Sequence, residues 1–264
     1  MKATMTTIRA LLRALTFTLG ITGYFLTALP FYPYFKVNPM AARKIICRIL
    51  GAYARFALWF MGFEVTREVK EAKGSENYLF VSNHLSYTDI LVICGYYPAC
   101  FVTSVEMRDT PFLGQICKLA GCVFVERRNK RNLGQEVKEI TEALKEGLDV
   151  VIFPEATSTN GEEVIRFRRP LFRAAIDSKI SVKPLTINYR YLDDEPVTLK
   201  NRDKVFWYGD MTFANHLWGV FSIKRIRVDL TVGESLKVGE EQDHGVLAEL
   251  SHSRVRSSYS PVLC

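Results

Sequence analysis

The chain has 264 residues, of which 48% are hydrophobic and 24% are charged, a composition typical of a globular protein and not of a disordered one. This length is sufficient for one large α/β domain, or for one domain with a small appendage. The net charge of +7 and the isoelectric point near 9.1 predict an anionic partner, which could be nucleic acid, an anionic membrane surface or a phosphate-bearing substrate. Charge alone does not distinguish these three.

Residues 1–63 predict a pair of membrane-associated helices. No charged residue lies between Arg13 and Lys36, and such a stretch is about long enough to cross a hydrocarbon core of ~30 Å as a helix. The stretch is preceded by basic residues, which favour a cytoplasmic N-terminus, and interrupted by glycines and prolines, which weaken a single straight span. A helix pair that dips into or lies on one leaflet is therefore favoured over a full span and over a cleaved signal peptide.

The second half of this region predicts an amphipathic helix at the membrane interface. Residues 45–63 are apolar apart from Arg48 and Arg55, which are spaced so that they lie on one helical face. The aromatic run at residues 31–35 fits an interfacial anchor at the end of the preceding apolar stretch. An anionic membrane surface is accordingly an expected partner, and the cytoplasmic face of the inner or plasma membrane is the expected location.

The six cysteines favour a cytosol-facing protein with reduced thiols. No two of them form a C-x-x-C pair, and most lie inside apolar runs such as Ile45-Ile46-Cys47. Buried thiols in a reducing compartment are therefore a better interpretation than a zinc site or a disulfide framework.

From residue 63 onward, short apolar strands alternate with helices, which predicts an α/β fold. We expect a mixed, partly parallel central sheet flanked by helices, in a domain that spans residues 64–235. Strands are expected at 77–82, 122–125, 149–153, 181–189, 204–208 and 225–232, and helices at 87–97, 111–120, 133–146 and 171–178. Residues 236–264 are polar and are expected to form a loose C-terminal tail.

Polar side chains follow three of the expected strands. His84 and Asp89 follow the strand at 77–82, a basic cluster at 126–131 follows the strand at 122–125, and Glu155 follows the strand at 149–153. Ligands of open α/β sheets bind at the carboxyl ends of strands, so the three groups converge if their strands are parallel neighbours. A histidine held by a carboxylate can take a proton from a hydroxyl, and arginines nearby can bind phosphate.

The motif VSNHLSYTDI at residues 81–90 also fits a pair of metal ligands or an ordinary strand-to-helix turn. A general base is favoured because the sequence places no further histidine nearby to complete a metal site. A serine hydrolase is disfavoured because the sequence contains no G-x-S-x-G motif. The tripeptide at 83–85 recurs at 215–217 without the acid or a comparable strand, so His216 is expected to be structural or interfacial.

Four sequence blocks resemble those of the glycerolipid acyltransferases typified by lysophosphatidic acid acyltransferase. They occur in the family's order over about residues 75–210, and paired N-terminal helices are also typical of the family. NHLSYTD resembles the N-H-x-x-x-x-D block, and the segment from Pro111 through Gly114 to Arg127 is similar to the second block, which ends in an arginine. FPEATS at 153–158 resembles F-P-E-G-T-R-S, and VKPL at 182–185 resembles V-x-P.

The resemblance implies transfer of a fatty acyl group from acyl-CoA or acyl-carrier protein to a hydroxyl of a lysolipid, with no metal and no cofactor beyond this donor substrate. His84 would be the catalytic base, and Asp89 would orient it and stabilise its charge. Arg127 would contact the acceptor phosphate, and Pro184 would support the acyl side. The third block would shape the acceptor site through Glu155, Ala156, Thr157 and Ser158.

Two departures from the family pattern affect the expected acceptor. Ala156 and Ser158 stand where the third block usually has Gly and Arg, so the loop is expected to differ and a hydrogen-bond donor to phosphate is lost. The arginines at 166, 168 and 169 could substitute for it. Relatives that acylate lyso-ornithine lipids have a similar T-S-x-x-G run, which here occupies residues 157–161.

The expected acceptor is therefore 1-acyl-glycerol-3-phosphate or a related lysolipid. Two alternatives remain open at this point. One is a lyso-ornithine lipid as the acceptor, and the other is a non-catalytic lipid-binding protein with the same fold. Nucleic-acid binding is disfavoured, because the apolar N-terminus fits it poorly and charge runs such as residues 127–131 are more often solvated faces or phosphate contacts.

Overall fold

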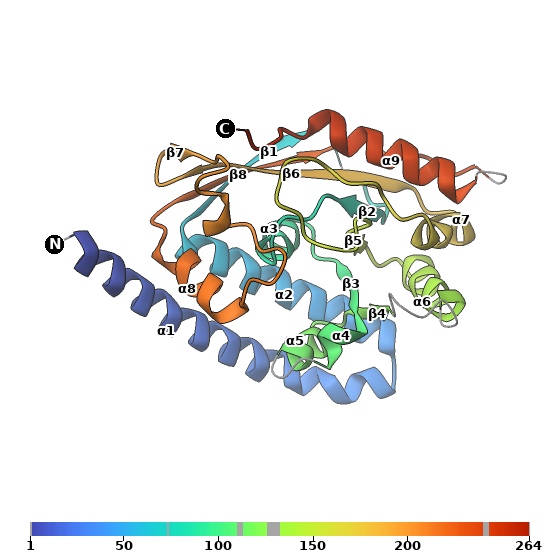
Figure 1. Cartoon of the computed structure of the whole chain (residues 1–264). Coiled ribbons are helices and arrows are strands. Elements are labelled where there is room, and N and C mark those ends of the chain that lie inside the picture. The colour runs from blue at the N-terminus through green and yellow to red at the C-terminus, as the bar shows by residue number, and fades with distance from the viewer. Residues whose placement is uncertain (1, 73, 110–112, 126–132, 240–242, 264) are drawn as a thin grey trace.

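The computed structural model describes residues 2–72, 74–109, 113–125, 133–239 and 243–263. Within these residues a mixed sheet of eight strands carries helices on both faces (Figure 1). The strand order is β1-β8-β6-β2-β5-β3-β4, and β7 pairs with β6 beside this path. The strands are β1 (Phe63–Val69), β2 (Leu79–Ser82), β3 (Cys100–Ser104), β4 (Val123–Val125), β5 (Val150–Ile152), β6 (Val182–Leu192), β7 (Glu195–Pro196) and β8 (Ile226–Val232).

The centre of the sheet is parallel, and this part carries the polar strand ends. Strand β2 pairs in parallel with both β5 and β6, and β3 pairs in parallel with both β5 and β4. Strand β8 is antiparallel to β6 and parallel to β1. All residues of β2 and β5 are buried, as expected for strands covered on both faces. The mixed, partly parallel α/β sheet is confirmed, and the carboxyl ends of β2 and β5 lie side by side.

The helices form two layers. Helices α2 (Pro39–Met61) and α3 (Thr88–Tyr96) lie on one side of the sheet, and α9 (His244–Ser258) lies on the other (Figure 1). Helix α1 (Lys2–Ala28) is outermost and packs against α2 and α8 (Phe213–Ser222). The shorter helical segments are η1 (Leu29–Lys36), α4 (Val105–Arg108), α5 (Leu113–Leu119), α6 (Leu133–Lys145), η3 (Pro170–Phe172), α7 (Arg173–Ser178) and η4 (Arg202–Lys204).

Arg13 attaches the outer helix α1 to the rest of the protein. Its guanidinium donates hydrogen bonds to the carbonyls of Phe60 at 2.9 Å and Lys224 at 3.0 Å, and to two further carbonyls at the end of α8. The last carbonyls of a helix have no partner within the helix, so Arg13 satisfies the ends of α2 and α8 together. Gly62 makes this possible, because its φ of 80° is left-handed and a Cβ there would overlap the Lys224 carbonyl.

The N-terminal region is apolar on its outer surface. Residues Thr4–Lys36 are long and apolar enough to cross a membrane, with a mean hydropathy of 1.4, and only 11% of the most apolar window is buried. Leu11, Leu15 and Leu19 on α1 are each more than half exposed, and Trp59 on α2 is 76% exposed. By length and composition, this helix indicates membrane association.

Most of the expected strands are confirmed, but one is wrong. Strands at 77–82, 122–125, 149–153, 181–189 and 225–232 appear as β2, β4, β5, β6 and β8. Residues 204–208 form no strand; the chain makes the turn η4 and then buries Val205 and Phe206 one after the other. Two consecutive core residues after a tight turn do not have the alternation of a strand. Strands β1 and β3 were not expected.

The expected loose C-terminal tail is also wrong. Residues 244–258 form α9, and Asp243 caps this helix by accepting hydrogen bonds from two amides of the first turn. Leu247, Ser251 and Val255 recur at a spacing of four, and all three are buried against the sheet side of the helix. The polar composition of the segment conceals this periodicity. The division of the chain at residues 63 and 235 stays a prediction.

Candidate active site

His84 and Asp89 form a hydrogen-bonded pair at the carboxyl end of β2. His84 Nδ1 lies 2.9 Å from Asp89 Oδ2, and the side chain of His84 is 18% exposed whereas that of Asp89 is fully buried. Because the carboxylate accepts, we assign the ring proton to Nδ1, which leaves a lone pair on Nε2. The five-residue spacing thus produces the contact that the sequence predicts.

The carboxylate of Asp89 is fixed on all sides. Besides His84, its Oδ2 accepts hydrogen bonds from the amides of Leu85 at 2.7 Å and Ser86 at 2.9 Å. Its Oδ1 accepts a hydrogen bond from the Tyr189 hydroxyl at 2.7 Å. Tyr189 comes from β6 and is buried, and burial raises the pKa of its hydroxyl. Sequence reasoning missed Tyr189, because a contact across a hundred residues has no local signal.

The ring and the backbone of His84 are held by other segments. The imidazole stacks on the Phe153 ring, with the ring centres 4.1 Å apart and an interplanar angle of 18°. The carbonyl of His84 accepts a hydrogen bond from the amide of Thr159 at 2.9 Å, and that of Leu85 accepts one from Trp207 at 2.9 Å. His84 is therefore oriented from the residue that follows β5, from the loop after it and from the segment before α8.

Asn83, the first residue of the histidine motif, extends the sheet by one step. Its side-chain amide donates to the Ile187 carbonyl at 3.0 Å and accepts from the Ile187 amide at 2.9 Å. These two bonds replace the backbone pairing that β2 and β6 lose when β2 ends. Sequence reasoning gave Asn83 no role, although its place directly before the histidine was a signal for one.

The second copy of the tripeptide contacts Tyr87, two residues after the first copy. His216 on α8 is buried, and its Nδ1 lies 3.0 Å from the hydroxyl of Tyr87. Burial lowers the pKa of His216, which favours the neutral ring. Tyr87 also packs edge-on against Trp207 and Phe213. His216 therefore supports a wall of the site, which is the kind of structural or interfacial role that the sequence predicts.

Glu155 lies beside the base and is buried. Burial raises the pKa of this carboxyl to about 9; the backbone N–H of His84 opposes the rise, and the negative charge of Asp89 adds to it. The carboxyl is therefore protonated near neutral pH. A neutral carboxyl can donate a hydrogen bond, which an ionised one cannot.

Ala156 has a left-handed backbone conformation, which is more favourable for the glycine that the family usually has at this position. Its amide donates to the Phe153 carbonyl at 3.0 Å to close a turn, and its φ is 59°, in the left-handed region. An L-residue pays about 1–2 kcal/mol for this conformation. We expected the alanine to change the shape of the loop. Instead, Ala156 adopts the left-handed conformation, and the tight turn is locally strained.

The remaining predicted site residues divide into three groups. Thr157 and Ser158 line the same cavity as His84. Pro184 is buried within β6, opposite Val81 of β2, and lies behind the site without lining that cavity. Arg127 lies outside the described residues.

The cavity beside His84, called the first cavity below, has a volume of about 510 Å³. It extends between α1, α2 and α3, and most of the residues that line it are apolar. Among the described residues that line it, His84 is the only Lys, Arg or His. Its lining includes Phe17, Ile21, Leu50, Phe60, Ile90 and Phe101.

This arrangement defines a class of protein before any comparison. A buried carboxylate orients an imidazole whose second nitrogen bonds no other described residue, and the imidazole opens on an apolar cavity that reaches the outer helices. Such a pair removes a proton from a hydroxyl, and the cavity suits a long apolar chain. An enzyme that transfers groups to or from hydroxyls of apolar substrates would have a site of this kind.

Comparison with known proteins narrows this class. The acyltransferase family model matches residues 63–188. The lyso-ornithine lipid O-acyltransferase of Brucella abortus (strain 2308) is 30% identical over 217 residues, which cover 80% of this chain and 81% of that protein. The 1-acyl-sn-glycerol-3-phosphate acyltransferase of Neisseria gonorrhoeae is 28% identical over 215 residues, which cover 81% of this chain and 80% of that protein. The chain belongs to the acyltransferase family.

A solved structure supports the fold. The crystal structure of the 1-acyl-sn-glycerophosphate (LPA) acyltransferase PlsC from Thermotoga maritima has a TM-score of 0.66 to this chain. The superposition covers 97% of this chain and 95% of the Thermotoga chain, at 20% sequence identity. At this identity the likeness establishes the fold, from the outer N-terminal helix to the end of the sheet.

Replacing Tyr189 by Phe is expected to lower the free energy of unfolding by about 1.5–3 kcal/mol, because the buried Asp89 carboxylate loses a hydrogen-bond donor. Urea unfolding in detergent micelles measures this. Tyr191→Phe is the control: Tyr191 lies on the same strand, is 39% exposed and donates no hydrogen bond to another described residue. Its effect should stay within about 0.5 kcal/mol. Equal effects of the two variants would contradict the role given to Tyr189.

Replacing Ala156 by Gly is expected to stabilise the protein by up to about 1 kcal/mol. Glycine relieves the left-handed strain, and its larger unfolded-state entropy offsets part of the gain. Ala214→Gly, at an exposed position of α8, is the control and should destabilise by about 0.5–1 kcal/mol. A loss of stability in both variants would show that the turn at Ala156 is not strained.

Proposed function

We propose that the protein is a lysolipid O-acyltransferase, which moves a fatty acyl group from an acyl thioester to a lysolipid hydroxyl. The observation that carries the proposal is the His84 imidazole, held by Asp89 through Nδ1 at 2.9 Å, with Nε2 free beside an apolar cavity. Both relatives named above are, by their names, acyltransferases, one of lyso-ornithine lipid and one of 1-acyl-sn-glycerol-3-phosphate, which supports a lysolipid as the acceptor.

The proposed reaction needs one base and no covalent enzyme intermediate. The acceptor oxygen attacks the thioester carbonyl carbon as its proton passes to His84 Nε2. The tetrahedral intermediate then collapses: the new ester C–O bond remains, the C–S bond breaks, and the proton on Nε2 passes to the leaving thiolate. Asp89 accepts from Nδ1–H throughout and stabilises the imidazolium that forms, as a carboxylate does in a catalytic triad. The first cavity would hold the acyl chain.

The acceptor head group is the finer part of the proposal. The family resemblance points to 1-acyl-glycerol-3-phosphate. One observation favours lyso-ornithine lipid over it: among the described residues no Lys or Arg lines the first cavity, and Ser158 lies there in place of the family's Arg. A phosphate monoester in this cavity would therefore lack a cation from the residues that line it, whereas an ornithine head group brings an ammonium group of its own.

We infer that the protein works at the cytoplasmic face of the inner or plasma membrane, on its anionic surface. The exposed apolar face of α1 and the exposed Trp59 of α2 support contact with lipid. The first cavity is lined by both of these helices, so an acyl chain could pass between it and the bilayer. The pair of N-terminal helices would thus place the site at the source of its lipid substrate.

Replacing His84 by Ala is expected to lower the rate of acyl transfer by about 10²–10⁴-fold, because the general base is lost. The assay follows thiol release from acyl-CoA or acyl-carrier protein that depends on added lysolipid. His252→Ala is the control, since His252 lies on α9 and bonds the Val164 carbonyl away from the cavity. Unfolding curves confirm that both variants fold. Full activity of His84→Ala would overturn the mechanism, and binding of lipid without transfer by the wild type would favour a non-catalytic protein.

The acceptor is tested by competition. Purified protein receives equal amounts of lysophosphatidic acid and lyso-ornithine lipid, and mass spectrometry of the products gives their ratio. Acylated ornithine lipid is expected to dominate, and Ser158→Arg is expected to raise the share of phosphatidic acid, because it restores a bidentate phosphate donor at the cavity. If the wild type forms mainly phosphatidic acid and Ser158→Arg leaves the ratio unchanged, residue 158 does not select the acceptor.

A further inference from the structure

A second cavity lies next to the first. Of the residues that the sequence connects with the acceptor, Ala156 lines it, and so do the arginines at 166, 168 and 169. Its volume is about 720 Å³, within the range of about 300–1,000 Å³ typical of small-molecule sites. It is formed by residues of β4, α6, β5, η3 and the start of α9. Most of its wall is apolar and includes Val125, Leu133, Ile152, Phe167 and Leu171.

The rim of the second cavity is basic. Arg166, Arg168, Arg169 and His244 lie around it. Glu249 pairs with two of these arginines, at 2.6 Å from Arg169 and 3.9 Å from Arg166. The exposed side chain of Arg168 makes no ion pair or hydrogen bond with any described residue, while its backbone amide is fixed by the Pro154 carbonyl at 2.8 Å. Arg168 is thus an available cation on an anchored backbone.

The described charged side chains around this cavity are mostly cationic. Three arginines lie at its rim, against two carboxylates: Glu136, which lines the cavity, and Glu249, which pairs with Arg166 and Arg169. The balance of charge around the cavity is therefore positive and suits an anionic group attached to an apolar or neutral chain.

The two cavities share a wall. Phe153 and Val102 line both, and the ring of Phe153 is the one on which His84 stacks at 4.1 Å. On one side of this wall the first cavity extends towards α1 and α2; on the other side the second cavity extends towards α6, η3 and α9. The reactive imidazole therefore lies where an apolar cavity adjoins a cavity with a basic rim.

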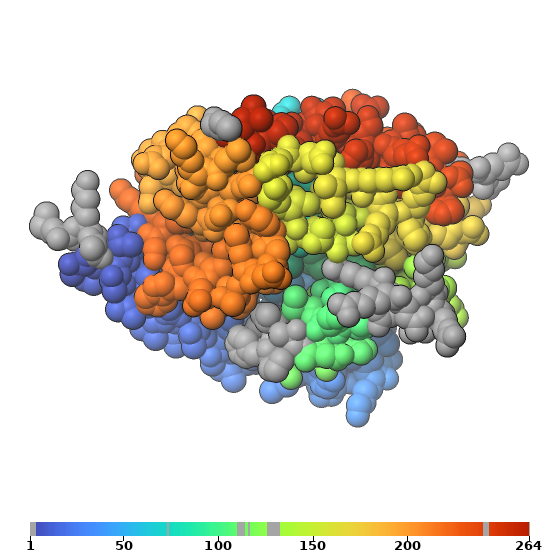
Figure 2. Space-filling model, in the orientation of Figure 1, coloured from blue at the N-terminus to red at the C-terminus, as the bar shows by residue number. Residues whose placement is uncertain are grey.

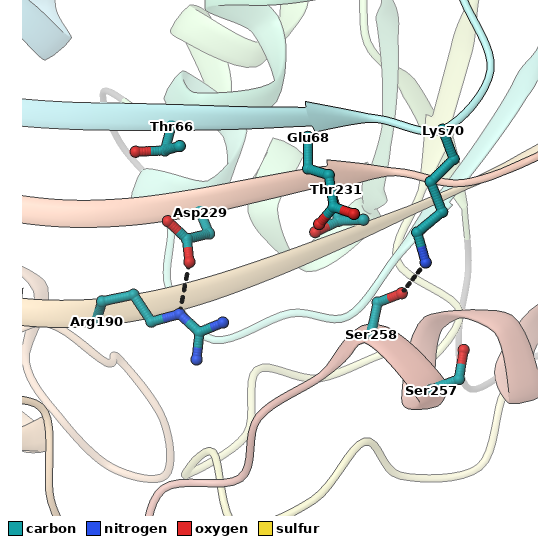
Figure 3. A pocket seen from close by; sticks show the side chains of 8 residues that line it. All are labelled: Thr66, Glu68, Lys70, Arg190, Asp229, Thr231, Ser257 and Ser258. Carbon is teal, nitrogen blue, oxygen red and sulfur yellow. Dashed lines mark hydrogen bonds and ion pairs between the residues drawn. The ribbon is translucent and has the colours of Figure 1, made fainter.

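A polar pocket elsewhere in the protein contains two cations that already have partners. Figure 3 shows this pocket, which lies between β1, β8, β6 and the end of α9. Its two cations are used by the pocket itself: Arg190 pairs with Asp229 at 2.6 Å, and Lys70 donates to Ser258 at 3.2 Å. The second cavity differs because Arg168 is left without such a partner.

We propose, building on the function proposed above, that the second cavity receives the phosphopantetheine arm of the acyl donor, and that Arg168 binds its phosphate. A thioester has two arms on opposite sides of the reacting carbonyl. If the acyl arm enters the first cavity, the pantetheine arm leaves His84 in the other direction, past Phe153. Its neutral amides and methylene groups suit an apolar channel, and its phosphate suits a guanidinium at the rim. The thiolate formed when the C–S bond breaks remains on this arm.

The arrangement of the helices separates the donor from the acceptor. Helix α1 runs along the lower edge of the molecule, and α9 along the upper edge (Figure 2). A lysolipid comes from the bilayer and reaches the site beside α1 and α2, whereas acyl-CoA and acyl-carrier protein are water-soluble and anionic. The second cavity, at α6, η3 and α9, is on the side away from α1. A water-soluble donor fits that side and a membrane lipid does not.

The test measures binding without catalysis, on the full chain in detergent micelles. Isothermal titration with 4′-phosphopantetheine and with coenzyme A is expected to give binding that Arg168→Ala weakens about five- to twentyfold and Arg168→Glu weakens further. Pantetheine, which lacks the phosphate, should bind the wild type and Arg168→Ala equally. Arg254→Ala, an exposed arginine far along α9, is the control and should leave all three affinities unchanged.

Kinetics then separate the donor from the acceptor. Arg168→Ala should raise the KM for acyl-CoA and for acyl-carrier protein, which share the phosphate, and leave the KM for the lysolipid unchanged. A raised lysolipid KM with unchanged donor KM would overturn the proposal and give the cavity to the acceptor head group. Unchanged binding of 4′-phosphopantetheine in both Arg168 variants would also overturn it. Because His84→Ala should bind coenzyme A normally, failure of the proposed reaction would be distinguishable from failure of this site.

Discussion

The structure of the site depends on one buried carboxylate. Asp89 is fully buried and is bonded by the His84 ring, by the amides of Leu85 and Ser86 and by the Tyr189 hydroxyl. An ionised carboxylate without these bonds would destabilise the core by several kcal/mol. The same four bonds fold the turn after β2, start α3 and fix the tautomer of the imidazole, so the chain cannot form the turn without also preparing the base.

The hydrogen bonds of Asp89 and Asn83 connect the turn that carries His84 to the central sheet. Tyr189 lies on β6, and Asn83 bonds the backbone of β6 at Ile187, so the turn that carries His84 is fastened to the strand beside β2 at two points. Strand β6 is in turn paired with β8 along most of its length. The position of Nε2 is therefore set by the rigid strand β6 together with the loop after β5, which bonds the His84 carbonyl. Such support suits the proposed reaction, because that reaction requires the acceptor oxygen and the thioester to meet in one geometry.

Features that depend on local sequence patterns, such as strands and the polar residues that follow them, could be predicted from the sequence. Periodicity located β2, β5, β6 and β8, and the polar residues after β2 and β5 located the site, because parallel neighbours bring their carboxyl ends together. The contact of Tyr189 with Asp89 could not be predicted, since it depends on the register of β6 against β2. Helix α9 was missed because its composition is polar, although Leu247, Ser251 and Val255 have a helical spacing. The placement of Arg127 stays a prediction.

The loop after β5 holds His84 even though its sequence departs from the family pattern at residues 156 and 158. Ala156 keeps a left-handed turn that costs about 1–2 kcal/mol, and Thr159 still bonds the His84 carbonyl, so the loop continues to hold the base despite its altered sequence. Ser158 in the same loop lines the first cavity and forms none of the four hydrogen bonds to Asp89. In the proposed reaction, a serine in place of the family's arginine would remove a charge from the acceptor side without altering the bonds that hold His84. The strained turn at residue 156 helps to position His84, whereas residue 158 would be able to vary with the head group.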